Sequence, residues 1–428
     1  MKAWLILADG TIFEGTSIGA TGKTIGETVF TTGMTGYLET LTDPSYFGQI
    51  VTQTFPLIGN YGDIPQDYES KKSWVRGYIV RELCDLPSNF RCEGTLSDFL
   101  KKQNIVGICG IDTRALTKRL RESGVMNGMI ISGDEINKIL KQVQDDGQVD
   151  NAACHADNTG CHAELVSASI LEEIKAYKIE QAVESVQSSS VIPPLDEGIC
   201  TSQSNADCPV KPDNDTNNKH IVLWDFGAKA NIQRELEKRG CKVTVVPCTT
   251  TSDEILALKP DGLMLSNGPG DPADNVQIIE ELKKICEYNQ KVVSTPSTPL
   301  RDRTTGVIPI FGICLGHQML ALARGCKTSK LKYGHRGGNH PCKDTETGRV
   351  YITSQNHGYA VENASLPSYA KMSFFNVNDG TVEGITYTDI PAFSVQFHPE
   401  ACGGPHDTNF LFDNFLARIQ EHQNAIKQ

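Results

Sequence analysis

The sequence predicts an α/β protein with two domains: a β-rich N-terminal domain with helices, and a C-terminal domain on a doubly wound, mostly parallel sheet. Three observations support this. The chain begins with short β-branched runs among many glycines, continues through a stretch poor in aromatic residues, and ends with apolar runs alternating with helical patterns. Such alternation is typical of parallel strands joined by right-handed crossovers. We therefore expect domains at 1–140 and 220–428, joined by a linker or insertion at 141–219.

The N-terminal domain combines short strands with at least one capped helix. Residues 29–32 and 77–80 are β-branched and aromatic runs next to glycine, as strands often are. Asp112 begins a helical pattern that continues to residue 122, with Leu116 and Leu120 on one face. These elements by themselves indicate no chemistry.

The linker at 141–219 has a different composition. Tyr177 is its only aromatic residue, and Ser, Asp, Asn and Gln dominate both ends. Such a stretch cannot bury enough apolar surface to offset its ordering entropy. Helical spacing nevertheless predicts one helix that docks on a neighbouring domain, carried by Ile170, Ile174, Tyr177, Ile179, Val183 and Val186.

The C-terminal domain alternates strand and helix patterns. We expect strands at 221–226, 242–246, 261–266 and 307–313, and helices at 231–239 (with Asn231 as the N-cap), at 275–288 and from Leu315 onward. In parallel sheets, ligands bind at the carboxyl ends of the strands. Motifs with chemical potential are therefore expected directly after strands.

Composition excludes several classes of protein. The 428 residues carry 40 basic and 52 acidic side chains, a net charge of −12 that disfavours general nucleic-acid binding. The longest stretch without these charged residues, 304–323, is interrupted by Pro309, Gly312 and Gly316, so it is not expected to span a membrane. Fourteen cysteines without a secretion signal indicate free thiols and a cytoplasmic location.

The strongest motif surrounds Cys314. An apolar run passes through Gly312, Cys314 and Gly316 into an amphipathic helix, which is the pattern of a nucleophile elbow with Cys in place of Ser. The helix N-terminus stabilises a thiolate, and the N–H of Leu315 is placed to stabilise an oxyanion. Taken alone, this interpretation competes evenly with the alternative that Cys314 is one more buried, inert cysteine.

Two further motifs favour nucleophilic chemistry. His398 and Glu400 follow an alternating strand pattern, and positions i and i+2 of an extended chain point to the same side. The carboxylate can thus orient the imidazole, completing a nucleophile–base–orienter set for acyl transfer. Directly after another predicted strand, 267–272 (Asn-Gly-Pro-Gly-Asp-Pro) forms a rigid loop suited to a second oxyanion donor, although alone it would be an ordinary tight turn.

These three segments, 312–318 (Gly-Ile-Cys-Leu-Gly-His-Gln), 398–400 (His-Pro-Glu) and 267–272, resemble the class I (triad) glutamine amidotransferase domain from about residue 219 onward. The segments 31–37, 41–46 and 110–117 resemble the N-terminal domain of carbamoyl phosphate synthetase small chains. The two matches cover about four fifths of the chain. The remainder is mostly 141–219 and a short apparent insertion at about 294–306.

The resemblance implies a glutaminase that passes ammonia to a large, ATP-using synthetase subunit, in a heterodimer or higher assembly, for carbamoyl phosphate formation from bicarbonate in pyrimidine and arginine biosynthesis. Cys314 would attack the glutamine amide, His398 would move the proton and Glu400 would hold His398, with oxyanion donors at the N–H groups of Leu315 and Gly270. A γ-glutamyl thioester would form and be hydrolysed to glutamate. The implied glutamine-binding residues are Ser45, Gly268, Gly270, Leu315, Gln318, Asn356, Gly358 and Tyr359.

The resemblance implies no cofactor on this chain, with ATP and Mg²⁺ on the large partner. The segment 22–24 (Gly-Lys-Thr) mimics a phosphate-binding loop but lacks its first glycine and following helix. The linker pairs Cys154-His155 and Cys161-His162, with Cys200 and Cys208, lack Cys-x-x-Cys spacing, so we expect no metal. Three alternatives stay open: a subunit of another synthetase such as anthranilate synthase, a catalytically silent regulatory scaffold, and a hydrolase acting on small molecules or peptides.

Overall fold

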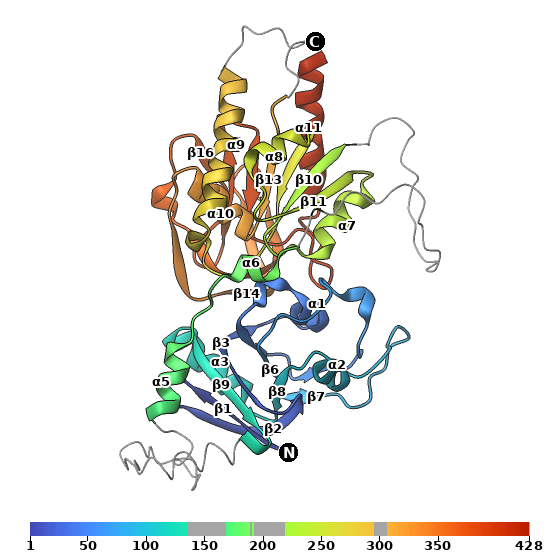
Figure 1. Cartoon of the computed structure of the whole chain (residues 1–428), viewed down its shortest axis with the longest axis vertical. Helices are drawn as coiled ribbons and strands as arrows, with labels where there is room; N and C mark the ends of the chain where they lie inside the picture. The colour runs from blue at the N-terminus through green and yellow to red at the C-terminus, as the bar shows by residue number, and fades with distance from the viewer. Residues whose placement is uncertain (136–167, 189–190, 192–218, 295–305, 428) are drawn as a thin grey trace.

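The computed structural model describes residues 1–135, 168–188, 191, 219–294 and 306–427. The linker cysteine–histidine pairs, Cys200, Cys208 and most of the apparent insertion at 294–306 lie outside these residues. The described chain forms a barrel from its N-terminal part and a large sheet with helices from its C-terminal part (Figure 1). None of the helices in these ranges is long and apolar enough to cross a membrane.

In residues 1–135 the N-terminal part forms a closed seven-stranded barrel with helices packed beside it. The strands join in the order β1-β2-β8-β6-β4-β3-β9. Their bounds are β1 (Lys2–Leu7), β2 (Ile12–Gly19), β3 (Lys23–Thr31), β4 (Gln49–Gln53), β6 (Gly77–Ile79), β8 (Val106–Cys109) and β9 (Met126–Ser132). The helices are α1 (Tyr37–Thr42), α2 (Leu96–Lys102) and α3 (Thr113–Ser123). As predicted, Asp112 caps α3 by accepting from the Ala115 N–H at 2.9 Å.

The C-terminal part is a nine-stranded sheet in the order β11-β10-β12-β13-β18-β17-β16-β14-β15. The first five strands are parallel: β11 (Lys242–Pro247), β10 (His220–Asp225), β12 (Gly262–Leu265), β13 (Ile310–Ile313) and β18 (Ala392–Val395). The other four pair antiparallel: β17 (Val382–Tyr387), β16 (Ala370–Asn376), β14 (Thr328–Asp344) and β15 (Val350–Val361). This confirms the predicted α/β class, although the antiparallel half was not predicted.

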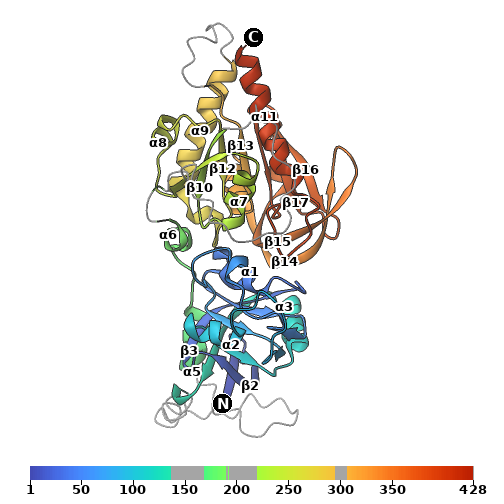
Figure 2. The ribbon, with the colours of Figure 1, turned by 90° about the vertical axis from the view of Figure 1, so that its right-hand side faces the viewer.

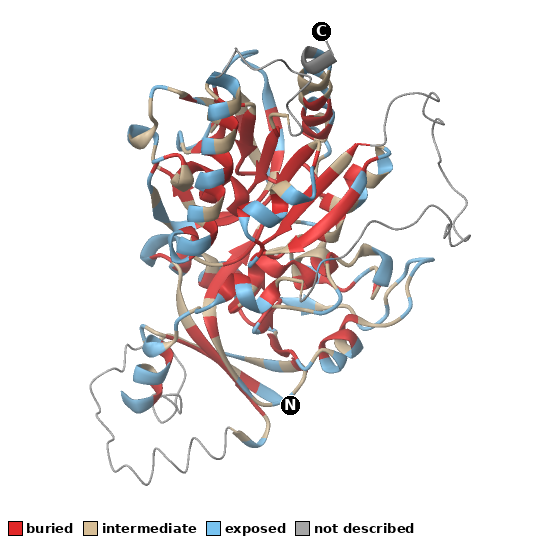
Figure 3. Cartoon of the chain, turned by 45° about the horizontal axis from the view of Figure 1, so that its top comes forward, coloured by how far each residue is buried: buried red, intermediate tan, exposed pale blue. Residues whose placement is uncertain are grey.

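Helices cover both faces of the parallel strands, which explains why those strands are apolar on both sides. Val222 and Trp224 of β10 pack in one core with α8 (Ser252–Ala257), α9 (Val276–Ser294) and α10 (Leu315–Ala323). Ile221 and Leu223 pack in the other core, with α7 (Ala230–Lys238) and α11 (Phe410–Lys427). Figure 2 shows α8 and α9 on one side of the sheet and α11 on the other, and in Figure 3 the central strands are almost entirely buried.

The described part of the linker holds two short helices where the spacing predicted one. α5 (Ala168–Ala176) packs Ile170 and Ile174 in the hydrophobic cluster of β9, at the barrel. α6 (Ala182–Val186) packs Val183 in the core of the large sheet. Gln181, with a φ of 48°, adopts a left-handed conformation at the N-cap of α6, so the helical path is broken between the two. Each helix thereby docks on a different part of the protein.

Candidate active site

Cys314 lies at a strained turn between β13 and α10. Its φ of 53° and ψ of −103° are rare for a residue with a side chain, and such strain persists only where the surroundings enforce it. Here the enforcement is close packing: a Cβ on Gly316 would lie 2.5 Å from the Leu265 carbonyl oxygen, and one on Gly312 would lie 2.9 Å from the Gly316 backbone. The predicted elbow is therefore present, and it holds a cysteine at the carboxyl end of a parallel strand.

His398 and Glu400 follow β18, the strand next to β13, and both side chains are fully buried. His398 Nδ1 donates to Glu400 Oε1 at 2.7 Å. The other ring nitrogen, Nε2, is buried and makes no hydrogen bond to any group in the described ranges. The ring is thus oriented by the carboxylate while Nε2 is left available to the neighbouring thiol.

The charges of His398 and Glu400 stabilise each other. Burial and the cation of Lys229 lower the pKa of His398, but Glu400 and the neighbouring Cys314 outweigh them and raise it. Burial raises the pKa of Glu400, but His398 and Lys229 lower it to about 2. Glu400 is therefore a carboxylate at neutral pH, and it stabilises the positive charge that His398 gains when it takes a proton.

Lys229 is a central residue that the sequence prediction missed. Its buried Nζ lies 3.5 Å from Glu400 Oε1 and 3.5 Å from Asp43 Oδ2, so it connects the sheet to the barrel. These carboxylates, together with Glu69, raise its pKa well above the usual value despite burial. The sequence could have indicated Lys229, because it is a polar residue just past β10, at the carboxyl edge of the sheet where ligands bind.

The predicted N-cap role of Asn231 is wrong. α7 begins at Ala230 with Lys229 as its N-cap residue, so Asn231 lies inside the first turn. Its side-chain amide donates to the backbone carbonyl of Glu400, and its N–H donates to Glu69 Oε2 at 3.1 Å. Tertiary contacts across the site, and not helix capping, thus explain this asparagine.

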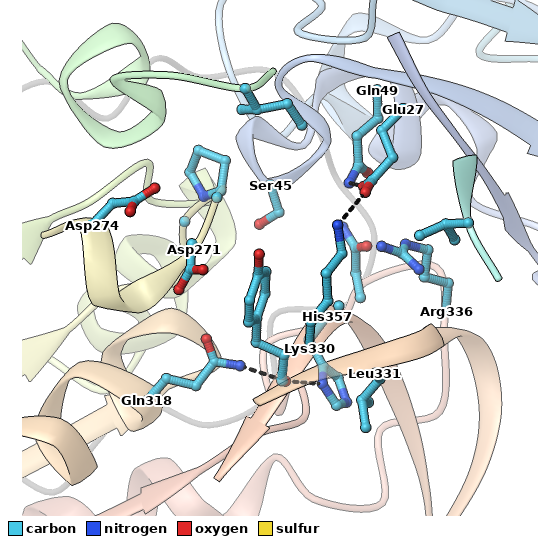
Figure 4. Close-up of a pocket in the computed structure, with 18 of the residues that line it drawn as sticks. Glu27, Ser45, Gln49, Asp271, Asp274, Gln318, Lys330, Leu331, Arg336 and His357 are labelled. Atoms are coloured by element: carbon cyan, nitrogen blue, oxygen red, sulfur yellow. Dashed lines mark hydrogen bonds and ion pairs between the residues drawn. The ribbon is translucent and has the colours of Figure 1, made fainter. Parts of the chain in front are cut away.

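A cavity of about 370 Å³ opens beside Cys314 between the barrel and the sheet (Figure 4). Seven of the eight expected glutamine-binding residues line it: Ser45, Gly268, Gly270, Gln318, Asn356, Gly358 and Tyr359. Leu315 is the exception, because its side chain packs in the hydrophobic core. It is the first residue of α10, a position where the backbone N–H has no intrahelical partner.

Hydrogen bonds between distant segments shape the cavity. Asn267 Nδ2 donates to Ser45 Oγ at 2.9 Å, which ties the loop after β12 to the barrel. Asn356 Nδ2 similarly donates to Asp43 Oδ2 at 3.1 Å. Residues 355–359 lie within strand β15, so Asn356, Gly358 and Tyr359 reach the cavity from a strand.

The loop after β12 is held close to the neighbouring strand end. A Cβ on Gly268 would lie 2.2 Å from the Phe226 carbonyl oxygen, so only glycine fits there. Gly270 has a φ of 88°, a conformation that also favours glycine. Close packing on the strand end thus holds this loop in place beside the cavity that Gly268 and Gly270 line.

Comparisons with known proteins agree with this geometry. Residues 222–418 match the glutamine amidotransferase class-I family, and residues 5–130 match the CPSase domain of the carbamoyl-phosphate synthase small chain. The chain is 45% identical over 420 residues to the carbamoyl phosphate synthase small chain of Vibrio cholerae, covering 98% of both chains. It is 46% identical over 422 residues to that of Bacillus anthracis (98% and 96%), and 43% identical over 413 residues to that of Symbiobacterium thermophilum (96% and 97%).

The C-terminal part is thus a class I glutamine amidotransferase domain carrying a cysteine, a histidine and a glutamate at one edge of its sheet. The N-terminal part is the CPSase domain of the carbamoyl-phosphate synthase small chain. The chain belongs to the carbamoyl phosphate synthase small chain family. This confirms the predicted family and its role as the glutamine-hydrolysing subunit, and it implies partnership with a large synthetase subunit.

Proposed function

We propose that Cys314, His398 and Glu400 form the catalytic triad with which this chain hydrolyses L-glutamine. One observation carries the proposal: an elbow cysteine lies beside a buried imidazole whose far nitrogen is bound to a buried carboxylate at 2.7 Å. That arrangement provides a nucleophile, its base and the group that orients the base. The family membership supplies the substrate class.

In the proposed reaction, His398 Nε2 takes the thiol proton and Cys314 Sγ attacks the side-chain amide carbon of glutamine. Negative charge develops on the amide oxygen, where the N–H groups of Leu315 and Gly270 stabilise it. The imidazolium then gives its proton to the leaving nitrogen, the C–N bond breaks, and ammonia departs. A γ-glutamyl thioester is left on Cys314, and a water molecule activated by His398 hydrolyses it to glutamate.

We assign glutamine binding to the predicted set of Ser45, Gly268, Gly270, Leu315, Gln318, Asn356, Gly358 and Tyr359. The orientation of Gln318 supports its membership. Its Nε2 donates to the Tyr359 carbonyl at 2.7 Å and to Gln396 Oε1 at 2.9 Å, so the amide nitrogen is occupied. The remaining amide oxygen is an acceptor suited to the α-ammonium group of glutamine.

We propose that the ammonia passes to the large synthetase subunit, in a heterodimer or a higher assembly. ATP and Mg²⁺ would be used on that subunit to make carbamoyl phosphate from bicarbonate for pyrimidine and arginine biosynthesis. A cytoplasmic location, without nucleic-acid or membrane partners, stays a prediction from composition.

The decisive experiment measures glutamate release from glutamine by the wild-type chain and by Cys314→Ser, each with and without the large subunit and its substrates. Cys326→Ser is the matched control, because Cys326 is also buried and lies just past the other end of α10. We expect activity that the large subunit stimulates, that Cys314→Ser abolishes and that Cys326→Ser retains. Activity insensitive to Cys314→Ser would refute the triad, and absence of any glutaminase activity would favour the silent scaffold.

A further inference from the structure

A buried polar cluster lies in the antiparallel half of the sheet, behind the cavity. It joins His335 of β14, His357 of β15 and Glu383 of β17, with one nitrogen or oxygen of each within 4.8 Å of the others. All three are at least nine-tenths buried, and the triad does not use them. Buried polar groups are costly unless they are paired, so a group of this size calls for a physical explanation.

The hydrogen-bond donors around Glu383 disfavour a metal ion in this cluster. Gln355 Nε2 donates to Glu383 Oε2 at 3.0 Å, and Asn376 Nδ2 donates to Oε1 at 3.3 Å. Amide N–H groups do not ligate cations, and both point at the carboxylate that would have to bind the metal. His335 Nδ1 also contacts Oε1, at 3.3 Å, while its Nε2 contacts Asp379 Oδ2 at 2.8 Å. The cluster is therefore a carboxylate surrounded by donors.

A chain of contacts leads from this carboxylate to the cavity. Glu383 Oε1 contacts His335 Nδ1 at 3.3 Å, and the His335 ring packs edge-on against the His357 ring, with 4.9 Å between the ring centroids. His357 Nδ1 lies 2.7 Å from the Tyr359 carbonyl oxygen, which can only accept, so Nδ1 carries the proton. The same carbonyl accepts from Gln318 Nε2 at 2.7 Å, and Figure 4 shows the two bonds converging on it.

We propose that Glu383 and His335 are positioning residues for the glutamine site. Glu383 holds His335, and His335 packs against the ring of His357. His357 donates to the Tyr359 carbonyl, and this carbonyl keeps the amide of Gln318 in one orientation. The orientation matters because a reversed amide would present a donor to the substrate ammonium in place of an acceptor. This inference rests on the proposed role of Gln318 in glutamine binding.

The main test variants are Glu383→Met, which removes the acceptors, and His335→Leu, which removes the ring that joins Glu383 to His357. A lost positioning contact is expected to raise the KM for glutamine about tenfold and to change kcat by less than about threefold. Glu383→Gln retains one acceptor oxygen for His335 and Asn376, so it should restore most of the affinity. His335→Leu is the test variant if Glu383→Met does not fold.

Asp389→Leu is the matched control. It also removes a carboxylate from a largely buried donor, Arg324, but at the last turn of α10, about 15 Å along the helix from Cys314. A merely structural loss lowers the fraction of active protein, and hence kcat, without changing KM. The control should therefore leave KM unchanged.

Alkylation of Cys314 by iodoacetamide separates failure of this inference from failure of the proposed function. Glu383→Met and His335→Leu should react at the wild-type rate, because the nucleophile and His398 are untouched. If KM stays within about twofold of wild type in those of the two variants that fold, or if Asp389→Leu raises it equally, the positioning role is overturned. If Cys314→Ser retains full glutaminase activity, the proposed function fails instead.

Discussion

Replacing Glu400 by Gln exchanges one oxygen of a fully buried carboxylate for an amide nitrogen at nearly constant volume. In the native protein, Glu400 Oε1 accepts from His398 Nδ1 at 2.7 Å and lies 3.5 Å from Lys229 Nζ. The neutral amide cannot stabilise the imidazolium that forms when His398 takes the thiol proton. We therefore expect turnover to fall while the protein remains folded.

The size of the effect follows from the bond that is lost. A hydrogen bond to a charged group contributes about 1.5–3 kcal/mol, and about 1.4 kcal/mol corresponds to a factor of ten in rate. The kcat for glutamine hydrolysis should thus fall about 10–150-fold. Because Glu400 is one of the groups that raise the pKa of His398, the acid limb of the kcat profile should also move to lower pH.

The assay is glutamate release at saturating glutamine over a range of pH. Glu235→Gln is the control, because Glu235 is also a buried carboxylate paired with a cation, at 2.5 Å from Arg239, but on the outer helix α7. The control should retain wild-type kcat and an unshifted profile. A Glu400→Gln kcat within about twofold of wild type, or an equal loss in the control, would refute the orienting role of Glu400.

Three further predictions concern the fold around the site. Gly316→Ala should abolish most glutaminase activity and lower the melting temperature, because the added Cβ would lie 2.5 Å from the Leu265 carbonyl oxygen. Lys229→Met removes the buried cation that Asp43 and Glu400 share, so urea titration should show a loss of about 3–5 kcal/mol in unfolding free energy. Burial lowers the pKa of His335, but hydrogen bonds to two carboxylates, that of Asp379 first among them, raise it to about 9. The charged His335 therefore stabilises the folded protein fully below about pH 6.5, and this contribution is lost as the pH rises to about 9. Asp379→Asn should reduce the loss of unfolding free energy between pH 6.5 and pH 9, as measured by denaturation curves at both pH values.

The parallel half of the sheet was predictable because its strands are buried on both faces. Residues 221–224 form an uninterrupted apolar run, as β10 requires between two helical layers. The turn at Cys314 was predictable for a related reason. Close packing at Gly312 and Gly316 excludes any side chain, so the glycines themselves mark the elbow.

The antiparallel half was not predictable from hydropathy, because many of its buried residues are polar. Residues 335–340 (His-Arg-Gly-Gly-Asn-His) are typical of a loop by composition, yet they lie within β14. His335 and Arg336 are 7% and 5% exposed. Their burial is stabilised by partners on other strands, such as Glu383, and a pattern search that equates buried with apolar cannot detect such pairs.

The orientation of polar side chains in the site was likewise not predictable from the sequence. Gln318 could be nominated from sequence, since it lies one helical turn past Cys314, but the sequence does not say which end of its amide faces the cavity. That choice depends on the Tyr359 carbonyl, 41 residues further along the chain. Ser45 likewise reaches the site through Asn267, from 222 residues away. Chemical groups can therefore be predicted from local motifs, whereas the direction in which each donor or acceptor points is set by contacts that form only when the barrel and the sheet come together.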